Sequence, residues 1–150
     1  MAPIEILLVE DNPATAQLTI EALRDPKVSY HVDVVEDGEE ALHFLHREAA
    51  YLAAPRPDLI FLDLGLPKID GRKVLATIKA DESLRDIPVI VLSCSSNPTD
   101  VEEGYRNQIA GYVTKPAGLD EYFTAIRSVT QLWFNVMTLP KTARANALGR

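Results

Sequence analysis

Polar side chains with catalytic potential stand at the ends of four apolar runs in this chain. Asp63 closes the run that begins at Leu59, and Gly65 and Pro67 follow it closely. A short unbroken apolar run is typical of a strand buried on both faces, as in a parallel sheet, whereas glycine and proline open a loop. Asp63 should therefore stand at the carboxyl end of a central strand, where open parallel sheets bind ligands. Considered alone, Asp63 could equally serve only to cap the turn that follows the strand.

The other three apolar runs end on groups that complement a carboxylate. They cover residues 4–9, 87–92 and 110–114, and the side chains at their ends are, in chain order, Glu10 with Asp11, then Ser93, and then Lys115. One such end is unremarkable, but four complementary ends in one short chain are hard to obtain by chance. Because the carboxyl ends of parallel strands meet at one edge of a sheet, we expect a single site there.

Carboxylates of the first and third runs suit a divalent cation. Asp11 and Asp63 are expected on adjacent strand ends, roughly 5 Å apart, and Glu10 joins them. Three carboxylates so close repel one another, and a cation such as Mg²⁺, which prefers oxygen ligands and keeps several waters, relieves the repulsion. Asp11 and Asp63 would bind it directly and Glu10 through water, with Mn²⁺ as a second candidate ion.

The two remaining strand ends suit a phosphoryl ligand. Lys115 is expected two strands from Asp63, roughly 10 Å across the sheet, a gap that only a long side chain closes. Its ammonium would pair with Asp63 or with a phosphoryl oxygen, and Ser93 would donate to another. Phosphoryl transfer needs little beyond in-line positioning and neutralised charge, and carboxylates serve as nucleophiles that form an aspartyl-phosphate. The set predicts Asp63 as the phosphoacceptor, with Lys115 and Ser93 as its catalytic partners.

Strand and helix patterns alternate along the chain. Strands are expected near residues 4–9, 30–35, 59–63, 88–93 and 110–114, and helices near 13–25, 39–48, 71–80, from 98 onward and 118–137. Five strands alternating with five helices predict an α/β fold with a doubly wound five-stranded parallel sheet, and the flavodoxin-like order 2-1-3-4-5 is the common small solution. The final helix is extended, about 19 residues or roughly 28 Å long.

Composition indicates one soluble domain. A chain of 150 residues suits a single core, and its net charge of −7 lacks the basic footprint of a nucleic-acid binder. No apolar run approaches the ~18 residues that span a bilayer, and no signal-peptide pattern is present. The single cysteine, Cys94, forms no internal disulfide, so we expect a cytoplasmic protein that binds neither membrane nor nucleic acid.

The strand-end motifs resemble the receiver domain of bacterial two-component response regulators. The segments LLVEDN, FLDLGLP, VLS and GYVTKPA occur in the expected order, and the resemblance covers about residues 3 to 130. It implies Mg²⁺-dependent phosphorylation of Asp63 by a phosphohistidine on a sensor histidine kinase, with a backbone carbonyl near Gly65 as a further metal ligand. It also implies a signalling protein rather than an enzyme, one that catalyses only its own phosphorylation and dephosphorylation.

The same resemblance assigns two switch residues and a peptide-bond geometry. On phosphorylation Ser93 would move toward the phosphate, and Tyr112 would turn inward. The Lys115–Pro116 bond would be cis by resemblance, although a trans bond is the default from sequence alone.

The end of the chain leaves little room for an output domain, so we expect a stand-alone receiver. Residues 1–137 would form the domain and 138–150 a tail, and the output would be contact with another protein or onward relay of phosphate. Surplus apolar side chains on the last helix predict a homodimer interface: Tyr122, Ile126, Leu132, Trp133, Phe134 and Val136. The alternative is that the tail folds back over its own domain.

Softer likenesses indicate the small response regulators paired with bacterial and cyanobacterial phytochromes. They lie in the loop at residues 55–57, the segment 71–75 and the ending 133–140. They imply a light-sensing histidine kinase of the phytochrome type as the partner.

Two other functions are alternatives. Phosphatases of the haloacid-dehalogenase type also use an aspartate nucleophile, magnesium, a hydroxyl and a lysine, but they need a second acid two residues after the nucleophile, where this chain has Gly65. A receiver fold kept only as a docking module would not be phosphorylated, and the intact set of Asp11, Asp63, Ser93 and Lys115 argues against that.

Overall fold

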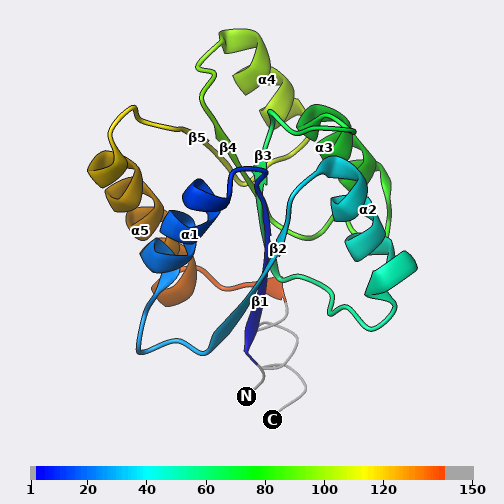
Figure 1. Cartoon of the computed structure of the whole chain (residues 1–150), viewed down its shortest axis with the longest axis horizontal. Coiled ribbons are helices and arrows are strands. Elements are labelled where there is room, and N and C mark those ends of the chain that lie inside the picture. Colours follow the sequence, from blue (N-terminus) through cyan, green and yellow to red (C-terminus); the bar gives the residue numbers. More distant parts are fainter. Residues whose placement is uncertain (1–2, 141–150) are drawn as a thin grey trace.

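In the part of the chain that the structure describes, five parallel strands form the centre and five helices cover the two faces of the sheet (Figure 1). A computed structural model describes residues 3–140. The strands are β1 (Ile4–Val9), β2 (Tyr30–Val35), β3 (Leu59–Asp63), β4 (Val89–Ser93) and β5 (Gly111–Thr114). The helices are α1 (Pro13–Leu23), α2 (Gly38–His46), α3 (Gly71–Ala80), α4 (Pro98–Arg106) and α5 (Leu119–Asn135), with a 3-10 turn η1 (Ala49–Tyr51). The strand order β2-β1-β3-β4-β5 confirms the predicted flavodoxin-like topology.

Asparagine–proline pairs start two of the helices. Asn12 caps α1 by accepting a hydrogen bond from the Thr15 backbone N–H at 3.0 Å, and proline follows it at the first helical position. Asn97 caps α4 by accepting a hydrogen bond from the Thr99 backbone N–H at 2.9 Å, again with proline at the first helical position. The far ends are less predictable: α1 stops at Leu23 and α5 at Asn135, each two residues before the expected end.

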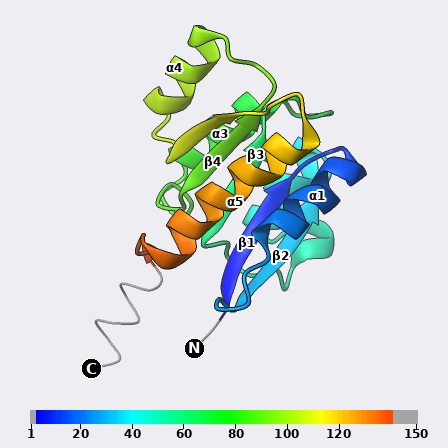
Figure 2. The ribbon, with the colours of Figure 1, turned by 90° about the vertical axis from the view of Figure 1, so that its left-hand side faces the viewer.

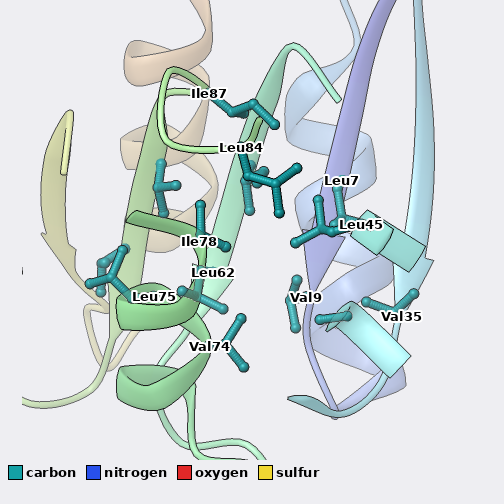
Figure 3. Close-up of a cluster of buried hydrophobic side chains, with 14 of the residues drawn as sticks. Leu7, Val9, Val35, Leu45, Leu62, Val74, Leu75, Ile78, Leu84 and Ile87 are labelled. Carbon is teal, nitrogen blue, oxygen red and sulfur yellow. The ribbon is translucent and has the colours of Figure 1, made fainter. Parts of the chain in front are cut away.

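Apolar side chains of the central strands point alternately to two core layers. Ile60 and Leu62 of β3 face the layer under α2 and α3, whereas Leu59 and Phe61 face the layer under α1 and α5. All four are fully buried, which explains why the strand is an unbroken apolar run. Figure 3 shows part of the first layer, in which Val74, Leu75 and Ile78 of α3 lie over the strands. Figure 2 shows α1 and α5 side by side on the opposite face.

The inner face of α5 belongs to the core of its own domain. Tyr122 and Ile126 are 4% and 0% exposed, and the Tyr122 hydroxyl lies 2.8 Å from the Thr19 hydroxyl of α1. The prediction that these two residues form an intermolecular interface is therefore wrong, because α1 and the sheet already cover them. Trp133 and Phe134 also pack partly against this layer, whereas Leu132 and Val136 are 46% and 72% exposed.

The segment after α5 returns to its own domain. Leu139 is only 2% exposed, and Pro140 lies with Arg56, Ile87 and Pro88 around a small hollow at the amino-terminal edge of the sheet. The domain therefore extends at least to Pro140, beyond the predicted boundary at residue 137. The remaining residues of the predicted tail, 141–150, lie outside the described residues. Within residues 3–140, no helix combines the length and apolar character needed to cross a membrane.

The placement of the inner face of α5 in the core of its own domain can be tested directly. Ile126→Ala is expected to lower the free energy of unfolding by about 3 kcal/mol, because the residue is fully buried and truncation leaves a cavity. Leu132→Ala, on the same helix but half-exposed, is expected to cost less than about 1 kcal/mol. Urea unfolding of both variants measures the difference, and equal losses would contradict the assignment.

Candidate functional site

Three carboxylates meet where β1 and β3 end. Val9 of β1 pairs with Leu62 of β3, so that Glu10 and Asp63 follow side by side at the carboxyl edge of the sheet. One carboxylate oxygen from each of Glu10, Asp11 and Asp63 lies within 4.8 Å of the others. Glu10 is buried, whereas Asp11 is exposed and opens the cluster to solvent. Hard oxygen donors at this spacing, open on one side, fit a divalent cation such as Mg²⁺ that keeps part of its water.

Lys115 reaches this cluster from the far side of the sheet. Its backbone N–H donates to the Ser93 carbonyl at 2.7 Å, which continues the pairing of β5 with β4. The Nζ atom lies 2.8 Å from Glu10 Oε1 and 2.9 Å from Asp63 Oδ2. The predicted reach across two strands is therefore what the structure shows, and one ammonium bridges two carboxylates.

Burial and the pairing of Lys115 with the carboxylates shift the pKa values of Glu10 and Lys115 in opposite directions. Burial raises the pKa of Glu10, and the hydrogen bond and charge of Lys115 offset only part of that rise. Burial alone would lower the pKa of Lys115, but its hydrogen bonds to Glu10 and Asp63 outweigh it and raise the pKa above the ordinary lysine value. Lys115 is therefore a permanent cation at neutral pH, suited to pairing with anionic oxygens rather than to proton abstraction.

Two groups from different parts of the site orient the Asp63 carboxylate. The Gly65 backbone N–H donates to Asp63 Oδ1 at 3.0 Å, while Lys115 holds Oδ2. Both carboxylate oxygens thus have a fixed partner. The metal-ligand role of the Gly65 carbonyl stays a prediction. The Lys115–Pro116 bond is trans, which is the default from sequence alone and differs from the cis bond that the resemblance implies.

Ser93 and Tyr112 are joined through the loop after β4. Ser93 is 5% exposed, and its Oγ accepts a hydrogen bond from the Ser95 N–H at 3.1 Å. The Tyr112 hydroxyl donates to the Ser95 carbonyl at 2.8 Å. Both predicted switch residues therefore meet at Ser95.

A salt bridge beside this loop was not predicted from the sequence. Arg72 of α3 pairs with Asp100 of α4, and Asp100 also accepts a hydrogen bond from the Ser95 hydroxyl at 2.8 Å. The two charged residues are 28 positions apart, so no local pattern links them. Their one local signal is that each stands in the first turn of a helix next to a predicted strand end.

Comparison with known proteins gives one family. The model of the response regulator receiver domain matches residues 6–127. The response regulator Rcp1 of Synechocystis sp. is 41% identical, over 92% of this chain and 94% of its own length.

Solved structures agree with this match. The phosphorylated cyanobacterial phytochrome response regulator RcpA is 46% identical with a TM-score of 0.89, covering 93% of this chain and 99% of its own. The Mn²⁺-bound form of Rcp1 is 40% identical with the same TM-score, covering 92% and 99%. The receiver domain of the sensor histidine kinase PA1611 from Pseudomonas aeruginosa is 32% identical with a TM-score of 0.67, covering 88% and 98%, and holds a magnesium ion in its active-site cleft.

Proposed function

The chain belongs to the response regulator receiver domain family, and from this premise we propose that it is a signalling receiver that accepts a phosphoryl group on Asp63 from a histidine kinase. The observation that carries the proposal is the Asp63 carboxylate itself. Lys115 Nζ lies 2.9 Å from one of its oxygens, and two further carboxylates lie within ligand distance of one ion. This is the arrangement that phosphoryl transfer to a carboxylate requires.

Each proposed role follows from charge and position. Glu10, Asp11, Asp63 and the Gly65 carbonyl would hold Mg²⁺, or Mn²⁺, which neutralises charge on the phosphoryl oxygens when bound. The Mn²⁺ bound in the Rcp1 structure and the magnesium ion in the active-site cleft of the PA1611 domain support a divalent ion at this site.

With the ion bound, the transfer step uses the side chains of this chain and the phosphohistidine donor. An Asp63 oxygen attacks phosphorus, the O–P bond forms, the P–N bond to the donor imidazole breaks, and the imidazole leaves with the electron pair. Lys115 pairs with a phosphoryl oxygen, and Ser93 donates its hydroxyl proton in a hydrogen bond to another. Water later releases inorganic phosphate and restores the carboxylate. Ser93 and Tyr112 are the proposed switch residues, because both are bonded to Ser95 beside the site.

We place the protein in a phytochrome-type pathway in the cytoplasm. The support is its likeness to RcpA and Rcp1, and it spans nearly the full length of both. The output would be contact with another protein or relay of phosphate, without binding nucleic acid or membrane. Gly65 offers no second acid beside Asp63, which disfavours turnover of outside phosphate esters.

Phosphotransfer from a kinase tests this function. A phytochrome-type histidine kinase, labelled on its histidine, is mixed with the native chain and with Asp63→Asn. Label is expected to move to the native chain and not to the variant. Label on both proteins, or on neither after the kinase has been shown to phosphorylate another receiver, would contradict the proposal.

A homodimer through the end of α5 is a further part of the proposal. With Tyr122 and Ile126 in the core, it rests on the exposed Leu132 and Val136, with Trp133 and Phe134 beside them. Sedimentation velocity over a range of concentrations is expected to show a dimer that Val136→Asp dissociates. A monomer at every concentration would exclude it.

A further inference from the structure

Arg72 and Asp100 form a two-bond salt bridge between α3 and α4. Arg72 Nε lies 3.0 Å from Asp100 Oδ1, and Nη2 lies 2.9 Å from Oδ2. The planar guanidinium meets the carboxylate edge to edge, the geometry that gives the strongest and most directional of ion pairs. A third nitrogen, Nη1, lies 3.3 Å from both oxygens of Asp70, the residue that caps α3. Arg72 is thus held on its own helix and points to its neighbour.

Asp100 connects Arg72 to the loop that follows Ser93 at the end of β4. Its Oδ2 accepts a hydrogen bond from the Ser95 hydroxyl at 2.8 Å, and that hydroxyl accepts one from the Asn97 N–H at 3.2 Å. The Ser95 N–H in turn donates to Ser93 Oγ at 3.1 Å. Because Ser93 accepts this bond, its hydroxyl proton stays available for another oxygen. The chain of contacts therefore runs from Arg72 to the hydroxyl beside Asp63.

Apolar packing does little to place the first turn of α4. Gly104 is the only buried residue of this helix, and it lies near the opposite end. A cavity of about 170 Å³ separates α4 from α3, with Leu75, Val91 and Tyr112 among its walls. With so little buried surface, α4 gains little from apolar packing, and its polar contacts carry more of its placement. The two hydrogen bonds between Arg72 and Asp100 join the first turn of α4 to α3.

We propose that Arg72 is a positioning residue for Ser93. Through Asp100 and Ser95 it holds the loop after β4 so that the Ser93 hydroxyl faces the phosphoryl group on Asp63. This inference rests on the proposed function, since it assigns a role within the phosphoryl site. Arg72 itself touches neither Asp63 nor Lys115 through any contact in the described residues, so its effect passes through Ser93. The bond to Arg72 also lowers the pKa of Asp100, which keeps the carboxylate charged.

A mutant cycle separates positioning from a merely structural role. The rate of phosphorylation by acetyl phosphate with Mg²⁺ is measured by intact mass for Arg72→Gln, Ser93→Ala and the double variant. Ser93→Ala is expected to slow the reaction about tenfold or more, as for loss of a transition-state donor. Arg72→Gln is expected to slow it about fivefold, the effect of one good hydrogen bond. In the Ser93→Ala background, Arg72→Gln should change the rate by less than about twofold.

Lys73→Gln is the matched control, because Lys73 is the exposed next residue on the same helix and lies outside the network. It should leave the rate unchanged. The proposal would be overturned if the double variant slowed by the product of the two single effects. It would also be overturned if Arg72→Gln reacted as fast as Lys73→Gln, because the bridge would then hold α4 without acting on Ser93.

A second measurement does not depend on phosphorylation. In the untreated protein, amide hydrogen exchange at Ser95 is expected to be faster in Arg72→Gln than in Lys73→Gln, since the loop loses its restraint. If the native chain accepts no phosphate but Ser95 exchange responds, the proposed function fails while the network stands. If the native chain is phosphorylated and Ser95 exchange is unchanged, the positioning role fails alone.

Discussion

Replacing Lys115 by methionine is expected to lower the free energy of unfolding at neutral pH by about 3 kcal/mol. Methionine keeps most of the packed side chain but removes the ammonium that bridges Glu10 and Asp63. Glu10 is 3% exposed, so its carboxylate would be left buried beside a like charge. Breaking a buried ion pair from one side costs more than the pair contributes, because the remaining charge has lost both water and partner. Urea unfolding measures the loss.

The loss should depend on pH in a direction that identifies its cause. Burial already raises the pKa of Glu10 above its usual 4.5, and removal of Lys115 removes the two largest effects that oppose the rise. A carboxyl whose folded pKa is raised makes the folded state bind the proton more tightly, so the variant gains stability as pH falls through that value. The difference between native and variant in free energy of unfolding should therefore shrink as pH falls from neutral toward the ordinary glutamate pKa of 4.5.

Two outcomes would contradict this account of Lys115. A loss that stays constant across this pH range would indicate packing rather than charge. A loss no larger than that of Lys73→Met, an exposed lysine on α3, would show that the bridge contributes nothing measurable. Added Mg²⁺ should restore part of the stability of Lys115→Met, because the ion neutralises the same carboxylates.

Adding one methyl group at position 71 is expected to disrupt the acceptor strand. A Cβ on Gly71 would lie 2.4 Å from the Asp63 carbonyl oxygen and 2.5 Å from Leu64 Cα. Both neighbours are backbone, so either α3 or the end of β3 must move. We expect Gly71→Ala to cost about 3 kcal/mol of stability and to slow phosphorylation about a hundredfold, because Asp63 is displaced with its backbone. Thermal unfolding and phosphorylation kinetics measure the two effects.

Gly65→Ala is the matched control for this substitution. A Cβ on Gly65 would meet Asp63 Oδ1 at 3.8 Å, an ordinary contact, and its φ is not in the left-handed region. The free energy of unfolding of Gly65→Ala should differ from that of the native chain by less than about 1 kcal/mol. Equal losses at the two glycines would show that the close approach of α3 to β3 is not what requires Gly71.

The convergence of the site follows from the sequence for a simple physical reason. A parallel strand buried on both faces leaves an unbroken apolar run, and the residue after the run stands at one edge of the sheet. Asp63 and Ser93 close such runs, so their neighbourhood could be predicted before any contact was known. Lys115 was predictable because the length of its side chain matches a gap of two strands.

Other features depend on contacts that local patterns do not encode. The apolar stripe of α5 shows that one face is buried, but not whether its own sheet or a second copy buries Tyr122 and Ile126. The Arg72–Asp100 bridge arises only when α3 and α4 lie together. The burial of Leu139 depends on the chain turning back after α5, and short segments without periodicity give no such signal.

Intact mass after incubation with acetyl phosphate and Mg²⁺ tests the central claim most directly, because it reports a covalent phosphoryl group without a kinase. The native chain is expected to gain one phosphoryl group, and the gain should disappear with Asp63→Asn or with a chelator. An equal gain in Asp63→Asn would contradict the assignment of Asp63. No gain in the native chain, once Mg²⁺ binding has been confirmed, would instead indicate a docking module that works without phosphorylation.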